Sequence, residues 1–385
     1  MRKARRILVL TLSFGSGHVQ AARAIAQELE RQSSDVEVLV VDALANSRLL
    51  FRAGYVWPYW AMVRYAPTLW DRFFTRRTAR LTRHTAPEWA FHWGCPRVFK
   101  TITWFRPDTI IATEVAACEM ATMAKREGLT AARIVSVITD YEAEPVWVKA
   151  EVDAYAVADK HVRDQLCAWG ASSNSIVTCG IPTGPAFYLK HDEKTTRARY
   201  NIHEPRPIVL IMGGGVGPTR MNEVTAILCA SREALHVIAV TGYDKHARRK
   251  LGRVRPLPTV SLRVLGWTDD IAALMQASAV LVTKPGGLTT AEAAACALPV
   301  VMFDAIPGPE RRNAARLTEV GAGVSTNGAR SAAAAVLTLL KDNDARRRMS
   351  ANAERLARPL ATTTIARLAL EERLPAQESA RRMTA

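Results

Sequence analysis

The stretch VTKPGGLTTAEAAACALPVVMFDAIPGPERRNA, residues 282–314, decides the fold of this chain. An apolar strand over 280–282 runs into a glycine turn at 285–287, and small residues on the following helix allow it to pack closely on a sheet. Because a second apolar strand follows at 298–303, the stretch predicts a βαβ crossover between parallel strands. Unpaired N–H groups at the start of the helix, together with the helix dipole, favour a bound anion.

Glu292 stands about one and a half turns into this helix. A carboxylate there would repel a phosphate, but it can accept hydrogen bonds from two neighbouring sugar hydroxyls. We therefore interpret the stretch as a nucleotide-diphosphate site with a ribose clamp. The alternative is an ordinary crossover in which Glu292 lies on a solvated face.

The composition indicates a two-domain globular protein with an anionic partner. The chain has 385 residues, of which 49% are hydrophobic, and its net charge is +16 with a pI near 10.0. This length is sufficient for two domains with their own cores. The charge favours binding to nucleic acid, an acidic lipid surface or a phosphorylated substrate.

The start of the chain imitates a signal peptide, with basic residues before an apolar run. The run spans only about seven residues and leads into Gly-Ser-Gly-His, so we interpret it as a first strand. No stretch reaches about 18 uninterrupted apolar residues, and no membrane-spanning helix is predicted. The six cysteines are scattered without metal-ligand spacing, which predicts reduced and mostly buried thiols.

The first half of the chain alternates apolar strands with helices. The strand 7–11, the loop 13–18 and the helix 19–31 open a βαβ unit with a glycine-rich loop, although neither standard phosphate-binding motif is complete. Further strands are predicted at 36–41, 109–112, 134–138, 154–157 and 176–178, and helices at 116–126 and 160–169. Asp140 follows a parallel strand directly, where such folds bind ligands, unless it is a turn or N-cap residue.

Residues 48–106 differ in composition from the rest of the chain. Six of the nine tryptophans lie here, and eleven Lys and Arg face only two acidic residues. Aromatic residues interleaved with arginines on helices are typical of a surface that lies in a lipid interface. The alternatives are a helical core with a solvated basic face, or a groove for single-stranded nucleic acid.

A second α/β half begins after a polar segment. We expect domain 1 over 1–190, a linker over 191–206, domain 2 over 207–357, and a C-terminal helix and tail over 358–385. The predicted elements of the second half are strands 208–212, 237–240 and 261–264, a helix from 269, and helices 310–319, 330–340, 343–357 and 361–372. Glycines at 213–217, after the first of these strands, indicate a second phosphate-binding loop. The predicted fold class is therefore α/β, with two doubly wound Rossmann-like halves that face a cleft.

Six motifs give the chain a family resemblance over residues 6–357. They are ILVLTLSFGSGHVQAA at 7–22, TDY at 139–141, GIPTGPAF at 180–187, IMGGGVG at 211–217, KPGGLTTAEA at 284–293 and PGPERRN at 307–313. In order and spacing the chain resembles the glycolipid branch of glycosyltransferase family 28, which comprises monogalactosyldiacylglycerol synthases and processive diacylglycerol glycosyltransferases. It is more distantly similar to the transferase that makes peptidoglycan lipid precursors.

The resemblance implies a GT-B fold, an inverting mechanism without a metal or other cofactor, and peripheral attachment to the cytoplasmic face of the inner membrane. It makes His18 the base or the acceptor orienter, with Asp140 as a second catalytic residue. It implies donor binding by Gly213, Gly214, Gly215, Gly217, Pro285, Gly286, Gly287, Leu288, Thr289, Glu292, Glu310 and Asn313. It implies an acceptor and membrane surface at Gly17, Trp57, Trp60, Arg64, Trp70, Arg76, Arg77, Trp89, Trp93 and Trp147.

The chemistry of sugar transfer agrees with these assignments. A histidine can take the hydroxyl proton at neutral pH, and backbone amides can meet the departing diphosphate. For His18 the alternative is a loop histidine bonded to backbone. The sequence Asp342-Asn343-Asp344 is expected to cap a helix rather than bind a metal.

The sugar loop departs from the family pattern at Pro309, Arg311 and Arg312. Glucose or galactose is the default donor sugar, and these arginines motivate glucuronate as a further hypothesis. The leading hypothesis is transfer of a hexose from a UDP-sugar to diacylglycerol on an anionic phospholipid surface, without a nucleic-acid partner. The alternatives are a polyprenyl-lipid acceptor, a nucleotide-sugar 2-epimerase of the same fold, and a non-catalytic binder of lipid or nucleic acid.

Overall fold

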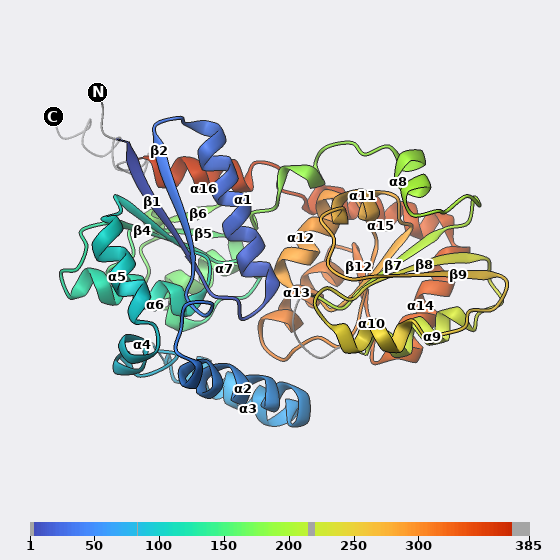
Figure 1. Ribbon diagram of the computed structural model, residues 1–385, viewed down its shortest axis with the longest axis horizontal. Helices are drawn as coiled ribbons and strands as arrows, with labels where there is room; N and C mark the ends of the chain where they lie inside the picture. The colour runs from blue at the N-terminus through green and yellow to red at the C-terminus, as the bar shows by residue number, and fades with distance from the viewer. Residues whose placement is uncertain (1–3, 83, 215–219, 372–385) are drawn as a thin grey trace. The chain divides into compact units, whose positions relative to one another are not determined.

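The computed structural model describes residues 4–82, 84–214 and 220–371, which form two compact units. Unit 1 comprises Met1–Gly184 and Leu360–Ala385, and unit 2 comprises Pro185–Pro359. Each unit holds one six-stranded sheet with helices on its faces (Figure 1). All the strand pairs are parallel, as the apolar strands predicted.

The sheet of unit 1 has the strand order β2-β1-β3-β4-β5-β6. Its strands are β1 (Arg5–Thr11), β2 (Val36–Asp42), β3 (Thr109–Ala112), β4 (Arg133–Val137), β5 (Ala154–Val157) and β6 (Ile176–Thr178). Each predicted strand is present, with ends shifted by at most two residues. The chain moves outward from β1 to β2 and then returns to β3 on the other side of β1. The topological switch point, where such sheets bind ligands, therefore lies between β1 and β3.

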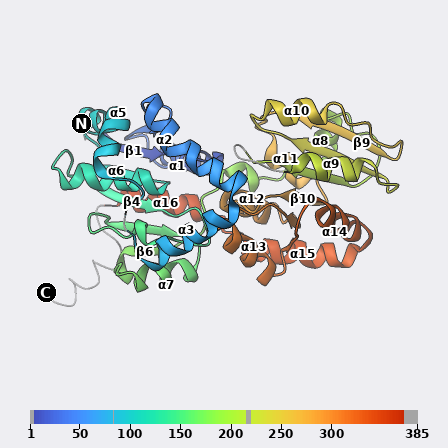
Figure 2. The same cartoon turned by 90° about the horizontal axis from the view of Figure 1, so that it is seen from below.

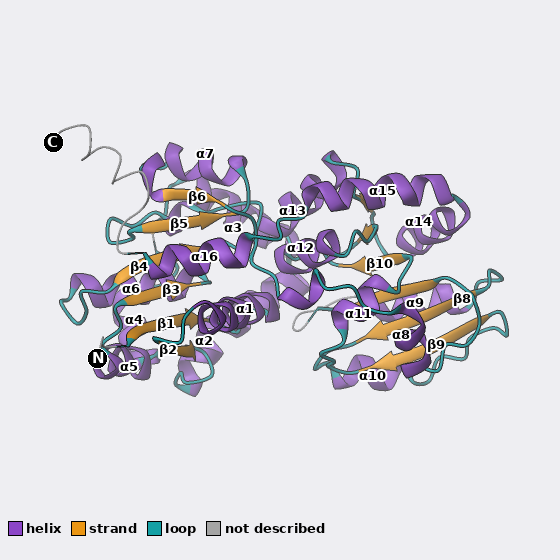
Figure 3. Cartoon of the chain, turned by 90° about the horizontal axis from the view of Figure 1, so that it is seen from above, coloured by secondary structure: helices purple, strands orange, loops and turns teal. Residues whose placement is uncertain are grey.

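Helices cover both faces of this sheet (Figure 3). They are α1 (Ser16–Gln32), α6 (Val115–Arg126), α7 (Lys160–Ala168) and α16 (Ala361–Leu370). The last of these comes from the far end of the chain, and its residues Ile365 and Ala366 are buried in the same core as Ile25 of α1. Thr362 Oγ1 donates a hydrogen bond to the carbonyl oxygen of Thr183, 2.8 Å away. The C-terminal helix is therefore part of unit 1.

Four helices are inserted between β2 and β3, in the region with the aromatic and basic composition. They are α2 (Leu49–Tyr65), α3 (Pro67–Ala79), α4 (Glu88–Gly94) and α5 (Pro96–Phe105). The first two contact each other and form a hairpin on one side of the unit (Figures 1 and 2). We call residues 49–79 the α2–α3 hairpin. Most of its side chains are exposed, and only Phe51, Val63 and Trp70 are buried.

The sheet of unit 2 has the order β12-β11-β10-β7-β8-β9. Its strands are β7 (Ile208–Met212), β8 (Leu235–Val240), β9 (Val260–Leu265), β10 (Val280–Thr283), β11 (Val300–Met302) and β12 (Gly323–Ser325). Here the switch point lies between β7 and β10, at the ends of the two predicted glycine loops. The edge strand β12 was not predicted, because three residues beginning with glycine carry no strand pattern.

Eight helices lie within the described residues of unit 2. They are α8 (Glu193–Arg199), α9 (Met221–Cys229), α10 (Lys245–Leu251), α11 (Ile271–Gln276), α12 (Gly287–Ala295), α13 (Pro309–Glu319), α14 (Ala329–Lys341) and α15 (Asn343–Leu356). Asp342 caps α15 by accepting a hydrogen bond from the Ala345 N–H at 2.8 Å, so the expectation that it caps a helix is confirmed. The chain also forms 3₁₀ turns η1 (Pro145–Trp147), η2 (Ser173–Ser175) and η3 (Pro185–Phe187).

The boundary between the units differs from the expected linker over 191–206. The division falls between Gly184 and Pro185, and the polar segment contains helix α8. Asp270 holds this segment to unit 2, since it accepts hydrogen bonds from Arg199 Nη1 at 2.7 Å and from the Tyr200 hydroxyl at 3.0 Å. The polar composition that indicated a linker instead reflects a short, mostly exposed surface helix.

Candidate functional site

His18 lies at the switch point of unit 1, in the first turn of α1. Its Nδ1 is 3.1 Å from the carbonyl oxygen of Thr113 and 3.0 Å from Thr139 Oγ1. Thr113 directly follows β3, and Thr139 follows β4 by two residues. Residues that follow β3 and β4 thus contact the imidazole that follows β1 in the chain. Neither threonine was predicted, although polar residues directly after buried strands could have indicated them.

The contact with Thr113 determines the tautomer of neutral His18. A carbonyl oxygen can only accept a hydrogen bond, so Nδ1 carries the proton and Nε2 carries the free lone pair. Thr113 Oγ1 also donates to the backbone oxygen of His18 at 3.2 Å, which fixes the first turn of α1. Among the described residues, none forms a hydrogen bond with Nε2. The histidine is bonded to backbone, as the alternative interpretation required, and it still presents a basic nitrogen.

The electrostatics of this site keep His18 neutral. Burial lowers the pKa of His18, and the negative charge of Asp140 acts in the opposite direction by a smaller amount. The structure therefore brings the two predicted catalytic residues close enough to interact. Gly17 directly precedes His18 and is half-buried. An imidazolium formed during a reaction would be stabilised by the neighbouring carboxylate.

The predicted acceptor and membrane residues divide into exposed and buried groups. Trp57, Trp89 and Trp93 are exposed, as are Arg64 and Arg76, and Trp60 is half-buried. Further exposed apolar residues of this region are Leu49, Leu50, Tyr65, Leu69, Phe73, Leu81 and Trp104. Exposed apolar residues with arginines between them are typical of an interaction site.

Three predicted surface residues require correction. Trp70 is 8% exposed and packs edge-on against Tyr59, with ring centroids 4.9 Å apart, and Trp147 is 7% exposed. Arg77 forms an ion pair with Glu144 in which both side chains are largely buried. Packing turns these three side chains inward, so they are not part of an exposed surface in this structure.

The glycine loops of unit 2 meet at its switch point. Gly214, after β7, has a φ of +76°, and a Cβ atom there would lie 2.9 Å from Lys284 Cε, after β10. Only glycine adopts this conformation without strain while allowing Lys284 to pass so close. Gly213 is buried beside it. The expected donor residues Gly215 and Gly217 lie outside the described residues.

A set of polar contacts holds the turn before α12. Lys284 Nζ is 3.2 Å from Glu310 Oε1, and Glu310 also accepts a hydrogen bond from the Ile306 N–H at 2.8 Å. Asn313, which is fully buried, donates from Nδ2 to the carbonyl oxygen of Pro285 at 3.0 Å. Glu310 of α13 thus contacts Lys284, and Asn313 of α13 fixes the backbone of the glycine turn.

The start of α12 presents backbone N–H groups that have no partner within the helix. Gly286 is the N-cap residue, and the backbone N–H groups of Gly287, Leu288 and Thr289 lie in the first turn, where no helical partner exists. Glu292 is 9% exposed, and burial raises its pKa to about 8. No described group forms a hydrogen bond with its carboxyl group. The carboxyl group of Glu292 is therefore buried and forms no hydrogen bond with the described residues.

Tyr243 and Trp267 are exposed aromatic residues that the sequence analysis did not assign. Their rings stack with centroids 4.8 Å apart and an interplanar angle of 9°. They follow β8 and β9 at the carboxyl edge of the sheet, with Tyr243 64% exposed. An exposed ring at this edge could stack on a nucleobase. The signal in the sequence was an aromatic residue directly after a glycine at the end of a strand.

Arg311 and Arg312 at the start of α13 differ in their surroundings. Arg312 forms an ion pair with Glu319 at 2.7 Å, so it is already partnered within α13, whereas Arg311 is exposed.

Within 4–82, 84–214 and 220–371, no group of three or more His, Cys, Asp and Glu side chains is arranged to hold a metal ion. In the same ranges, no helix combines the length and hydropathy that a bilayer crossing requires.

Both halves of the chain match models of known glycosyltransferase domains. Residues 18–183 match the model described as monogalactosyldiacylglycerol (MGDG) synthase, and residues 194–356 match glycosyl transferases group 1. A processive diacylglycerol beta-glucosyltransferase of Bacillus cereus is 28% identical over 343 residues, covering 89% of this chain and 87% of that protein. The chain thus combines a domain of the monogalactosyldiacylglycerol synthase type with a domain of the group 1 glycosyl transferase type. The resemblance drawn from the six motifs is thereby confirmed.

Solved structures share the fold of this chain. MurG of Acinetobacter baumannii aligns with a TM-score of 0.61 at 15% identity, covering 95% of this chain and 99% of that chain. The UDP-GlcNAc 2-epimerase of Neisseria meningitidis bound to UDP-GlcNAc aligns with a TM-score of 0.59 at 12% identity, covering 95% and 99%. Because transferase-like and epimerase structures align equally well, the fold alone does not distinguish these activities. The sequence relatives do, and they favour transfer.

Proposed function

We propose that this glycosyltransferase moves a hexose from a UDP-sugar to the free hydroxyl of diacylglycerol at a membrane surface. The observation that carries the proposal is the hydrogen bond from His18 Nδ1 to Thr113, which leaves Nε2 as the basic nitrogen. The named activity of the Bacillus cereus relative supports the acceptor. The UDP-GlcNAc held by the epimerase of the same fold supports the donor class.

The reaction would be a single displacement that inverts the sugar. The acceptor oxygen attacks the anomeric carbon while its proton passes to His18 Nε2, and the bond from that carbon to the diphosphate oxygen breaks. The departing UDP keeps the electron pair of this bond. Asp140 stabilises the imidazolium that His18 becomes, because its charge favours the protonated form. No metal or other cofactor is needed for these proton and electron movements.

The donor would bind to unit 2. Backbone N–H groups at the start of α12 and the ammonium of Lys284 provide positive potential for the diphosphate. Glu292 would accept hydrogen bonds from the ribose hydroxyls, and the exposed face of Tyr243 would stack on the base. Glucose or galactose remains the expected sugar, and Arg312, one of the arginines that motivated glucuronate, is already paired with Glu319.

The exposed aromatic and basic residues of the α2–α3 hairpin and of α4 would bind the lipid surface. Indole rings favour the headgroup level, and arginines are attracted to anionic phospholipids. We place the enzyme as a peripheral protein on the cytoplasmic face of the inner membrane, as its resemblance to the glycolipid branch implies. Extraction of the bound protein from membranes by concentrated salt, without detergent, would test this placement.

The deciding experiment measures transfer of labelled sugar from a panel of UDP-sugars to diacylglycerol in anionic liposomes. His18→Gln serves as the matched variant, and stabilisation by UDP reports on the donor site separately. We expect one sugar to reach diacylglycerol and the variant to lose most of the rate. Stabilisation by UDP without transfer to diacylglycerol would overturn the acceptor, and polyprenyl lipids would be tested next. Release of a 2-epimerised UDP-sugar would overturn the transferase assignment.

A further inference from the structure

The loop that carries His18 is held by an aromatic side chain against the α2–α3 hairpin. Phe14 lies between β1 and α1, four residues before His18. Its ring contacts Tyr55 at 5.6 Å and Tyr59 at 4.8 Å between centroids, both edge-on. It is also 6.5 Å from the ring of Trp60. All three partners belong to α2, so a movement of this helix acts directly on the loop of the base.

The same hairpin holds the loop on the other side of His18. Arg77, in the last turn of α3, forms an ion pair with Glu144, and their side chains are 16% and 13% exposed. Glu144 follows Asp140 and Thr139 in the segment after β4, and Thr139 contacts the imidazole. A partly buried ion pair resists separation, because a charge left without its partner is costly. The hairpin is therefore connected to both segments that surround the base.

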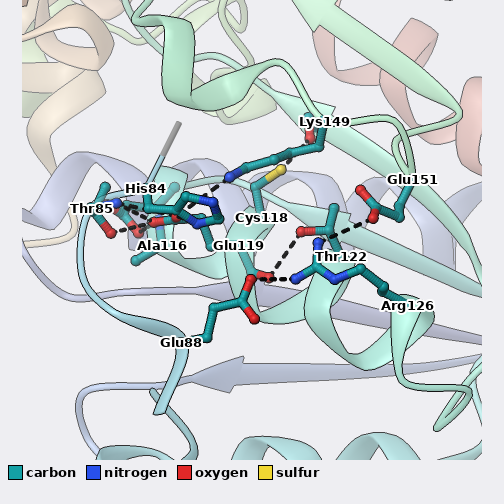
Figure 4. Close-up of polar contacts among 12 residues, drawn as sticks. His84, Thr85, Glu88, Ala116, Cys118, Glu119, Thr122, Arg126, Lys149 and Glu151 are labelled. Atoms are coloured by element: carbon teal, nitrogen blue, oxygen red, sulfur yellow. Dashed lines mark hydrogen bonds and ion pairs between the residues drawn. The ribbon is translucent and has the colours of Figure 1, made fainter. Parts of the chain in front are cut away.

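The root of the hairpin is anchored to α6 (Figure 4). Glu119, which is 1% exposed, accepts hydrogen bonds from the Thr85 N–H at 3.1 and 3.0 Å, and Lys149 Nζ lies 3.4 Å away. The Tyr55 hydroxyl donates to Thr85 Oγ1 at 3.1 Å, so α2 shares this anchor. His84 extends toward the same carboxylate, with Nδ1 3.3 Å from it. The hairpin is thus fixed at one end, while its exposed side chains lie along α2 and α3.

We propose that Phe14 and Arg77 are positioning residues. When the α2–α3 hairpin binds a lipid surface, their contacts adjust the position of the His18 base. The inference rests on the proposed function, because the surface is the one that would carry the acceptor. Both residues act through their contacts with the hairpin and with the segments around His18. Their effect is to set the loop geometry around His18 when Trp57 and its exposed neighbours enter the interface.

The kinetic test separates positioning from lipid affinity. The variants Phe14→Leu and Arg77→Lys are assayed with diacylglycerol in phosphatidylglycerol vesicles, over a range of vesicle concentrations at saturating UDP-sugar. We expect both to bind vesicles as tightly as the wild type and to lose about 10-fold or more in kcat, since small displacements of a catalytic group are costly. Phe14→Tyr keeps the ring and is expected to retain the rate. An unchanged kcat in Phe14→Leu would overturn the proposal.

Arg347→Lys is the matched control for Arg77→Lys, because Arg347 is exposed on α15 of unit 2 and also pairs with an acidic residue, Asp344. It should leave both vesicle binding and kcat unchanged. Thermal melting of every variant, with and without UDP, verifies that the variants fold. If Phe14→Leu does not fold, Arg77→Lys gives the same readout through the second connection, and unchanged kcat there overturns the proposal.

A second measurement does not depend on transfer. Vesicles are expected to change the rate at which diethylpyrocarbonate modifies His18 in the wild type, and Phe14→Leu should abolish this dependence. A wild type whose His18 reactivity is insensitive to vesicles would overturn the proposed connection even if transfer is observed. Conversely, vesicle-dependent reactivity without transfer to diacylglycerol would overturn the proposed acceptor and leave the connection supported.

Discussion

The hydrogen bond from His18 Nδ1 to the carbonyl oxygen of Thr113, 3.1 Å long, joins the segments that follow β1 and β3. These strands flank the switch point of the first sheet, so the bond spans the place where ligands bind in such folds. It also determines which nitrogen of the imidazole can accept a proton. One contact between residues far apart in the chain therefore positions the base and sets its chemistry.

Replacing His18 by glutamine should lower kcat by roughly 10²–10⁴, the usual contribution of a general base. The amide keeps a hydrogen bond to Thr113 but cannot take a proton. Because the donor loops belong to unit 2, stabilisation by UDP should be unchanged. Single-turnover transfer, with UDP-induced thermal stabilisation as the control, would measure both effects. A variant with wild-type kcat would exclude His18 as the base.

On the acidic side of the pH profile, the rate should fall only at a pH below the ordinary pKa range of histidine. Burial lowers the pKa of His18, and the neutral form is the reactive one, so activity should persist as the pH falls below 6.5. Asp140→Asn removes the charge that raises the pKa of His18. The limb of this variant should therefore move to still lower pH, with a lower plateau rate. A shift of the limb to higher pH would contradict this assignment, and kcat/KM between pH 5 and about 9 would reveal it.

Glu292→Gln should stabilise the ligand-free protein at alkaline pH. Burial raises the pKa of Glu292 from 4.5 to about 8, so the folded state keeps a proton that the unfolded state loses between these values. The free energy of unfolding of the wild type therefore falls as the pH rises through this window, and glutamine removes that loss. Urea denaturation at pH 5 and at pH 8.5 should show a gain for the variant only at the higher pH. The same variant should lose most of its stabilisation by UDP.

Two glycine substitutions should have opposite effects. Gly214→Ala places a side chain at a φ of +76° and against Lys284, which should cost about 1–3 kcal/mol. Gly54→Ala lies within α2 with no atom near the added methyl group, and should gain about 0.5–1 kcal/mol. Thermal unfolding measures both changes. Equal stability of the two variants would argue against the strained conformation at Gly214.

Two tryptophans that were predicted to form the acceptor and membrane surface should respond differently to alanine. Trp57 is 69% exposed, so its loss should weaken binding to anionic vesicles and change the free energy of unfolding by less than about 0.5 kcal/mol. Trp147 is 7% exposed, and its loss should destabilise the protein by about 3–5 kcal/mol. Vesicle sedimentation at low and high salt, together with urea denaturation, distinguishes the two outcomes. Normal vesicle binding by Trp57→Ala would contradict the proposed lipid surface.

Much of the fold could be predicted because its strands are buried on both faces. Such strands are continuous apolar runs, which is why β3 and β5 were found with their observed ends. Segments whose structure depends on partners elsewhere were missed. Helix α8 is polar and is held by Asp270, and β12 exists only because β11 lies beside it. The exposure of the tryptophans could not be predicted either, since it depends on how α2 and α3 pack.

The amino-acid sequence by itself determined the two parallel sheets, the glycine loops at their carboxyl edges, the family, and the identity of the residues from which a site could be built. The sheets and glycine loops arise from local composition and periodicity, and the family from the resemblance carried by six motifs. Only the tertiary structure decided that His18 presents Nε2, that Glu292 is a buried carboxyl with a raised pKa, and that Arg77 pairs with Glu144. The physical reason is that tautomer, pKa and burial are set by neighbours in space, which lie tens of residues away along the chain.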